Sequence, residues 1–131
     1  MTNNEINQLV KKAKQFAENS FVPVSERLEG SAVLTDGKIL FGGCLVENDD
    51  LALTRTAVEI AILKSVSEGH LHLNAICKYS SSDNIPYLTG VERQLVWQFG
   101  KDAVIICAND RGVETYSAYE MFPYAYEGGN K

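Results

Sequence analysis

The stretch Leu51-Ala-Leu-Thr-Arg-Thr-Ala-Val-Glu-Ile-Ala-Ile-Leu-Lys-Ser-Val-Ser-Glu-Gly-His70 decides the fold that the sequence predicts. Its apolar side chains recur at helical spacing and cover enough of the helix surface to be buried on most sides. Thr56 and Glu59 form a T-x-x-E capping box, so the helix is predicted to begin at Thr56. Gly69 follows the last apolar turn and is predicted to end the helix. The stretch therefore predicts a buried central helix.

The segments before this helix predict one further helix and a β-hairpin. Residues 3–19 place apolar side chains at helical intervals, and Thr2-x-x-Glu5 is a second capping box. Residues 30–35 and 38–47 are typical of strands, and Asp36-Gly37 between them is a strong hairpin signal. The chain is thus expected to enter the central helix from the second strand of a hairpin.

The segments after the central helix alternate between strands and helices. We expect strands over 73–79, 103–108 and 113–116, of which 103–108 is a short continuous apolar run, as in a strand covered on both faces. We expect helices after the boxes Thr89-x-x-Glu92 and Ser117-x-x-Glu120, the first ending at Gly100 and the second before Pro123. The tail at residues 124–131 is aromatic and then loose. This order predicts one α/β domain over residues 1–131, a three-layer α/β/α sandwich with a mixed five-stranded sheet.

Composition excludes several classes of function. The 131-residue chain has a net charge of -5, which argues against a nucleic-acid partner, because such proteins cluster Lys and Arg. No apolar run approaches the ~20 residues that cross a membrane, and the first residues lack the pattern of a signal peptide. We therefore expect a cytoplasmic protein whose three cysteines (Cys44, Cys77 and Cys107) are free and buried.

Several phrases of this sequence resemble the cytidine deaminase superfamily over about nine-tenths of the chain. They are Leu34–Leu40, Val46-Glu47-Asn48, Ala61-Ile62, Val66–His70 and Arg93-Gln94, and the segment Val22–Glu26 resembles the blasticidin-S deaminases. The resemblance implies the fold predicted above and a nucleoside ligand. In that family, a zinc ion held by three Cys or His ligands activates water, and a glutamate that does not bind zinc transfers protons. The resemblance also implies a homo-oligomer, a tetramer or a dimer, which the aromatic residues Phe122, Tyr124 and Tyr126 would suit.

The residues that carry this chemistry in the family are replaced here. By the resemblance, the three ligand positions hold Thr56, Thr89 and Glu92, and the proton-transferring glutamate falls on Val58. Threonine hydroxyls are poor zinc ligands at neutral pH, so no metal or other cofactor is expected. In the N-x-E-N motif that binds the substrate, Leu45 replaces the first Asn, while Glu47 and Asn48 remain as candidate substrate-binding residues. His70 and His72 lie at or beyond the far end of the central helix and are expected at the surface.

We predict from these residues a cytidine deaminase-fold protein without the zinc site and without zinc-dependent deaminase activity. It would bind a nucleoside-like small molecule at a pocket around Glu47, Asn48, Thr56, Val58, Thr89 and Glu92, or serve in assembly. A pocket that has filled and binds nothing is a further possibility.

The alternative is a hydrolytic cytidine or blasticidin-S deaminase. A shifted alignment of Ala57-Val58-Glu59 would make Glu59 the acid/base residue, but it supplies no metal ligand. A metal-free enzyme that uses Glu92 or Glu47 as its acid/base residue is a third possibility. Glu59 and Glu92 are therefore the candidate catalytic residues.

Overall fold

The structure is a computed structural model that describes residues 1–126 and 128. Its helices are α1 (Asn3–Ala17), the 3-10 helix η1 (Leu51–Leu53), α2 (Ala57–Ser67), α3 (Gly90–Phe99) and α4 (Ala118–Met121). Its strands are β1 (Glu29–Thr35), β2 (Leu40–Cys44), β3 (Leu73–Ser80), β4 (Val104–Ala108) and β5 (Val113–Ser117). Of the tail expected at residues 124–131, residues 127 and 129–131 lie outside the described part of the chain.

The five strands form one mixed sheet in the order β2-β1-β3-β4-β5. β1 pairs antiparallel with both β2 and β3, and β5 pairs antiparallel with β4. β3 and β4 are parallel, with α3 in the connection between them. The predicted mixed five-stranded sheet is confirmed, and its central strand is β3.

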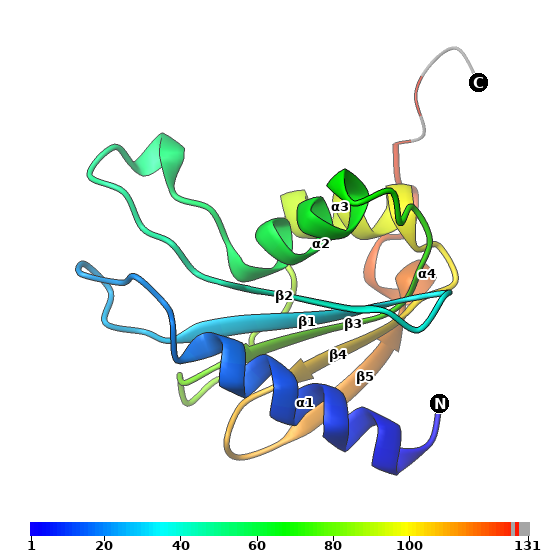
Figure 1. The fold of residues 1–131 in the computed structure, drawn as a ribbon, viewed down its shortest axis with the longest axis horizontal. Helices are drawn as coiled ribbons and strands as arrows, with labels where there is room; N and C mark the ends of the chain where they lie inside the picture. Colours follow the sequence, from blue (N-terminus) through cyan, green and yellow to red (C-terminus); the bar gives the residue numbers. More distant parts are fainter. Residues whose placement is uncertain (127, 129–131) are drawn as a thin grey trace.

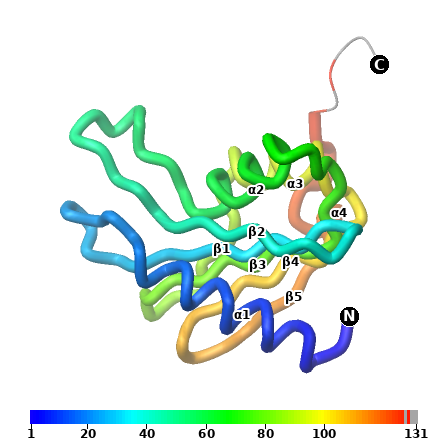
Figure 2. The backbone as a smooth tube through the Cα atoms, in the orientation of Figure 1, coloured from blue at the N-terminus to red at the C-terminus, as the bar shows by residue number. Residues whose placement is uncertain are grey.

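Helices cover both faces of the sheet, as Figures 1 and 2 show. Helix α1 lies on one face, where Leu9, Ala13 and Ala17 pack with Ala32, Cys77 and Ile106 of the strands. Helices α2, α3 and α4 lie on the other face, over a larger core that includes Val33, Val58, Ile62, Ile76, Val96 and Ile105. The predicted three-layer α/β/α sandwich is therefore confirmed.

Two predicted boundaries and one turn need correction. Strand β2 ends at Cys44, not at residue 47, because Val46 leaves the hairpin and makes isolated bridges with Phe21 and Arg55. Helix α1 ends at Ala17, not at 19, where the Ser20 hydroxyl donates to the Ala17 carbonyl. In the predicted Asp-Gly turn, the residue with left-handed backbone is Lys38 (φ 62°).

A loop extension projects beyond the sheet, formed by residues 20–28 and 45–56 (Figure 1). The backbone N–H of Phe21 donates to the Leu45 carbonyl, and that of Glu47 donates to the Phe21 carbonyl. Helix η1 lies in the second segment and was not predicted, because its three residues carry no helical periodicity. The extension carries Glu47 and Asn48, two of the candidate site residues.

Within the described residues, no helix is both long enough and apolar enough to cross a membrane.

Candidate functional site

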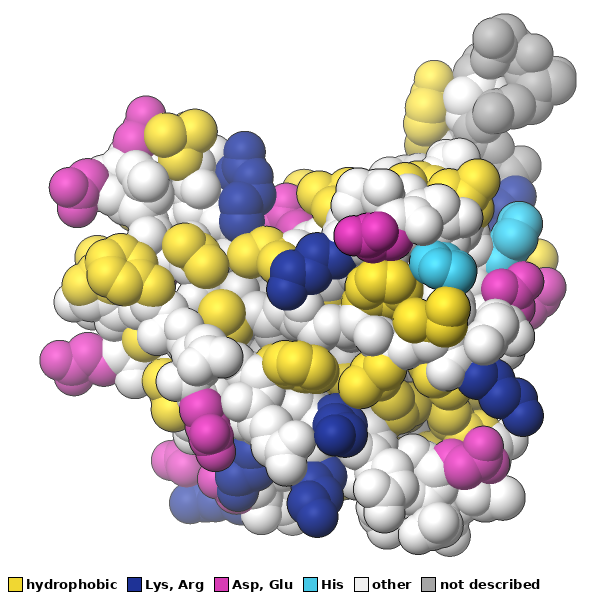
Figure 3. All heavy atoms as spheres, viewed as in Figure 1, with side chains coloured by type: hydrophobic (Ala, Val, Ile, Leu, Met, Phe, Trp, Pro, Cys, Tyr) yellow, Lys and Arg dark blue, Asp and Glu magenta, His cyan; other side chains and the backbone are white. Residues whose placement is uncertain are grey.

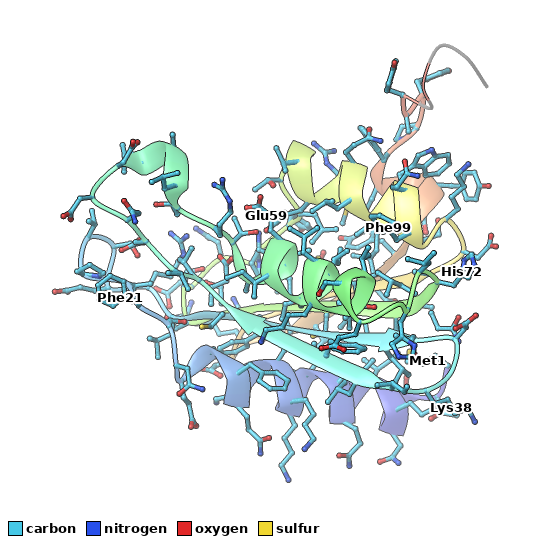
Figure 4. The ribbon with its side chains drawn as sticks, turned by 45° about the horizontal axis from the view of Figure 1, so that its top comes forward. Met1, Phe21, Lys38, Glu59, His72 and Phe99 are labelled. Carbon is cyan, nitrogen blue, oxygen red and sulfur yellow. The ribbon has the colours of Figure 1, made fainter. Side chains whose placement is uncertain are left out.

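The start of α2 is built as the sequence predicts. The Thr56 hydroxyl accepts the backbone N–H of Glu59 at 3.2 Å, and Glu59 Oε1 accepts the backbone N–H of Thr56 at 3.0 Å. Figure 4 shows Glu59 at this end of the helix. Val58 is fully buried in the apolar core beneath the same turn. The Thr56 and Glu59 side chains are therefore committed to capping the helix.

The start of α3 repeats this arrangement, with one difference. The Thr89 hydroxyl accepts the Glu92 backbone N–H at 3.2 Å, and Glu92 Oε1 accepts the Thr89 backbone N–H at 2.9 Å. Glu59 is half-buried, whereas Glu92 is completely buried. A carboxylate in such a place needs a compensating charge.

Lys78 of β3 supplies that charge. Its Nζ atom lies 2.7 Å from Glu92 Oε1 and donates to the Tyr87 carbonyl at 3.2 Å. The Lys78 side chain is 6% exposed and the Glu92 side chain 0%. Glu92 Oε2 has no hydrogen-bond partner among the described residues. The sequence prediction missed this ion pair.

Strand register explains why Lys78 points to this side of the sheet. Lys78 lies opposite Ser31, and Ser80 opposite Glu29, in the antiparallel pairing of β3 with β1. Side chains alternate along a strand, so all four share the face of Val33 and Ile76, whose apolar core packs under α2 and α3. The apolar face thus ends in a buried polar group made of Glu29, Ser31, Lys78 and Ser80, which we call the polar end of the sheet.

Glu29 of the polar end is a second buried carboxyl group that interacts with Lys78. Burial raises its pKa, Lys78 lowers it and the Glu92 charge raises it again. The backbone N–H of Ala57, in the first turn of α2, also stabilises its charged form. Glu29 Oε2 lies 3.6 Å from Arg27 Nη2, while Glu29 Oε1 and Ser31 Oγ have no partner among the described residues. Two buried carboxyl groups, Glu29 of the polar end and Glu92 of α3, therefore lie around one ammonium group.

A cavity of about 310 Å³ opens beside the polar end. Its wall is polar on the side of the strands and the loop that follows β3, and it is made of Arg27, Glu29, Lys78, Ser80, Ser82, Asn84, Ile85 and Pro86. Glu92, one of the residues assigned by resemblance, does not line the cavity itself. It is connected to the cavity wall through its ion pair with Lys78. The cavity offers hydrogen-bond donors and acceptors together with both signs of charge.

The candidate substrate-binding residues lie in the loop extension. Glu47 Oε1 accepts the backbone N–H groups of Val24 and Ser25, at 2.9 and 3.2 Å, and hydrogen bonds from Ser25 and then Val24 lower the pKa of Glu47. Asn48 Oδ1 accepts the backbone N–H of Asp50 at 2.9 Å. Both side chains therefore stabilise the conformation of the loop extension.

The histidines lie at the other end of α2. His72 is exposed, as expected, and Figure 4 shows it far along the molecule from Glu59. His70 is half-buried against the ring of Phe41, with ring centroids 5.5 Å apart. Within residues 1–126 and 128, no group of three or more His, Cys, Asp or Glu side chains could hold a metal ion.

Solved structures share this architecture. The cytidine deaminase from Burkholderia pseudomallei superposes with a TM-score of 0.88 at 27% identity, over 96% of this chain and 100% of that one. The chain has the cytidine deaminase fold. The cytidine deaminase from Mycobacterium tuberculosis superposes with a TM-score of 0.80 at 28% identity, over 92% of this chain and 96% of that one.

Sequence relatives point to the same superfamily. A cytidine deaminase from Sporosarcina psychrophila is 24% identical over 124 residues, 93% of this chain and 91% of the relative. A probable cytidine deaminase from Dictyostelium discoideum is 29% identical over 124 residues, 94% of this chain and 84% of the relative. No protein-family model matches the chain. These relatives support the cytidine deaminase superfamily as the origin of the fold.

The residues at the assigned ligand positions do not fit a zinc ion. Zinc in such sites is held by thiolates, imidazoles or carboxylates, and Thr56 and Thr89 offer only neutral hydroxyl groups that already cap helices. Glu92 offers a carboxylate, but an ammonium group lies 2.7 Å from it. A second cation at this point would be repelled by Lys78.

Proposed function

We propose that this protein is a cytidine deaminase-fold protein that works without zinc-dependent deamination and binds a nucleoside-like small molecule. The observation that carries the proposal is that the side chains at all three assigned ligand positions make helix caps or an ion pair. Thr56 and Thr89 cap α2 and α3, and Glu92 both completes a cap and pairs with Lys78. Side-chain caps stabilise a helix by about 1 kcal/mol each, so these residues have a structural role that needs no metal.

The chemistry of the cavity supports a neutral ligand rich in hydroxyl or amide groups. Arg27 and Lys78 bring positive charge to its wall, and Glu29 and Glu92 lie against them with negative charge. This balance favours neither an anion nor a cation strongly, while Ser80, Ser82 and Asn84 offer hydrogen bonds. Glu47 and Asn48 stay in the proposal as further ligand contacts, on the strength of the family resemblance alone.

The second candidate function is hydrolytic deamination of cytidine or of blasticidin S. The names of the relatives and of the superposed structures favour it. Its acid/base residue would be Glu59 or Glu92. The residues at the assigned ligand positions would remain Thr56, Thr89 and Glu92. An assembly role, in a tetramer or dimer of this chain, is compatible with either function.

Metal content and turnover together test the proposal. The purified full-length protein is expected to retain far less than one zinc ion per chain after dialysis against zinc at neutral pH, and to release no ammonia from cytidine or blasticidin S. Tight zinc at one ion per chain, with turnover of cytidine, would overturn it.

Calorimetric titration with cytidine and uridine tests the ligand class. Binding of either is expected to weaken at least about tenfold in Ser80→Ala, which removes a hydroxyl group from the cavity wall. Ser67→Ala is the matched control, since the Ser67 hydroxyl donates to the Lys64 carbonyl on the surface of α2. Equal loss of affinity in both variants, or no binding by the native protein, would contradict the proposed ligand.

A further inference from the structure

We propose that the ammonium group of Lys78 is an internal replacement for the metal ion: it supplies, at the start of α3, the positive charge that zinc supplies in deaminases. The proposal rests on the proposed function, because a chain that binds zinc at this point has no need of a replacement. It assigns to Lys78 a role that follows from no sequence motif. Its basis is the position, burial and partners of the ammonium group.

The ammonium group contacts Glu92, which occupies one of the assigned ligand positions. Lys78 Nζ is 2.7 Å from Glu92 Oε1, and the same oxygen accepts the backbone N–H of Thr89 at 2.9 Å. One carboxylate oxygen therefore joins the cation to two of the three positions that the resemblance assigns to zinc ligands. An ammonium group at this oxygen repels a second cation at the same point.

Two buried carboxyl groups require a cation here. Glu92 is 0% exposed and Glu29 is 4% exposed, and Glu29 interacts electrostatically with both Glu92 and Lys78. Lys78 is the buried cation beside these two carboxyl groups, whereas the Arg27 side chain near Glu29 is 45% exposed. Desolvated charges of this kind are stable only when they are paired.

Lys78 also links the sheet to the start of α3. It comes from β3, the central strand of the sheet in Figure 1. Its ammonium group donates to Glu92 on α3 and to the Tyr87 carbonyl in the segment before α3. A bound metal ion holds helix starts together through its ligands. Here one side chain holds the start of α3 against the centre of the sheet.

Restoring the metal ligands tests the proposal directly. The first variant combines Thr56→Cys, Thr89→Cys and Glu92→Cys and keeps Lys78, and the second adds Lys78→Ala. Zinc binding is measured by competition with a chromophoric chelator, and absorption of cobalt(II) in place of zinc reports thiolate ligands. We expect the variant with Lys78→Ala to bind one zinc per chain at least about tenfold more tightly than the variant that keeps Lys78.

The outcomes separate this proposal from the proposed function. Tight zinc in the native protein would overturn both. A native protein without zinc, together with equal zinc affinity in the two cysteine variants, would overturn only the role of Lys78. A matched addition of Lys12→Ala, on the exposed side of α1, is expected to leave zinc affinity unchanged.

Thermal unfolding keeps the test decisive if the cysteine variants do not fold. Lys78→Met is expected to lower the unfolding midpoint by roughly 10 °C or more, because it leaves Glu92 buried without a cation. The double variant Lys78→Met with Glu92→Gln is expected to recover at least about half of that loss, since it removes both charges. A loss in Lys78→Met no larger than in Lys12→Met, or no recovery in the double variant, would overturn the role of Lys78 as the compensating cation.

Discussion

Glu29 is the side chain whose protonation is expected to set the pH dependence of stability. Burial raises its pKa above the usual value of 4.5, so the folded state holds this proton more tightly than the unfolded state. The contribution of Glu29 is therefore fully favourable below pH 4.5 and is lost as the pH rises through its folded pKa.

Glu29→Gln should remove this dependence. We expect the variant to gain free energy of unfolding relative to the native protein as the pH rises above 4.5, and to be the more stable of the two at pH 8. Urea unfolding at a series of pH values measures the difference. Ser31→Ala, which changes the opposite neighbour of Lys78 and carries no titrating group, serves as the control, and a difference that falls with pH would refute the assignment.

At the scale of single residues, the sequence reveals capping groups well and buried charges poorly. Thr56, Glu59 and Thr89 have the roles that their local spacing predicts, because each partner lies three residues away. Lys78 escaped prediction because its partner Glu92 is 14 residues away, and the burial of Glu29 beside Lys78 and Glu92 depends on elements distant in sequence. The available signal was a lysine two positions after Ile76 on the inward face of an apolar strand, where a charge is costly.

At the scale of elements, the close packing of α2 on β2 depends on Gly43. A Cβ atom at this position would lie 2.6 Å from the Ala57 carbonyl oxygen and 2.8 Å from the Ala61 backbone nitrogen. Gly43→Ala is therefore expected to push the first turns of α2 off the sheet and to lower the free energy of unfolding by about 1–3 kcal/mol.

Gly90 provides the matched comparison. It begins α3, and a Cβ atom there would meet nothing within 4 Å. Gly90→Ala should raise the free energy of unfolding by about 0.3–1 kcal/mol, because alanine loses less backbone entropy in a helix. Chemical denaturation of both variants distinguishes the two sites, and equal effects of the same sign would contradict the packing described here.

Helix starts were predictable because their signals are local. Each of the four predicted capping boxes forms, at Thr2, Thr56, Thr89 and Ser117. The loop extension was not predictable, because its backbone is fixed by bridges from Val46 to Phe21 and Arg55, which are distant in sequence. The start of α2 and α3 could thus be placed from the sequence, whereas the cavity wall depends on β1, β3 and the loop after β3.

At the scale of the whole molecule, the loop extension exposes apolar side chains that a second copy of the chain could cover. Phe21, Val24, Leu51 and Leu53 are 58%, 72%, 78% and 55% exposed. Hydrophobic side chains gather over this part of the surface in Figure 3, and Figure 4 shows Phe21 at its edge. Clustered exposure of this kind marks an interaction surface.

We therefore expect the protein to form a dimer or tetramer in which this surface is buried. Light scattering during size exclusion should give a mass of two or four chains at micromolar concentration, and Leu51→Glu with Leu53→Glu should shift it toward one chain. Leu71→Glu changes a side chain that is 49% exposed outside the extension and is the control. A native protein that elutes as a single chain would contradict the expectation.

Because two of the three thiols are buried, their reactivity reports local unfolding of the protein. Burial raises the pKa of Cys77 and raises that of Cys107 to about 12, whereas Cys44 is half-buried. The thiolate is the nucleophile that attacks a thiol reagent, so the more accessible Cys44 should react first and the other two only when the sheet separates from its helices. Mass spectrometry of labelled protein in increasing urea should then count opening events of the two layers, with Cys77 reporting the α1 side and Cys107 the side of α2 and α3.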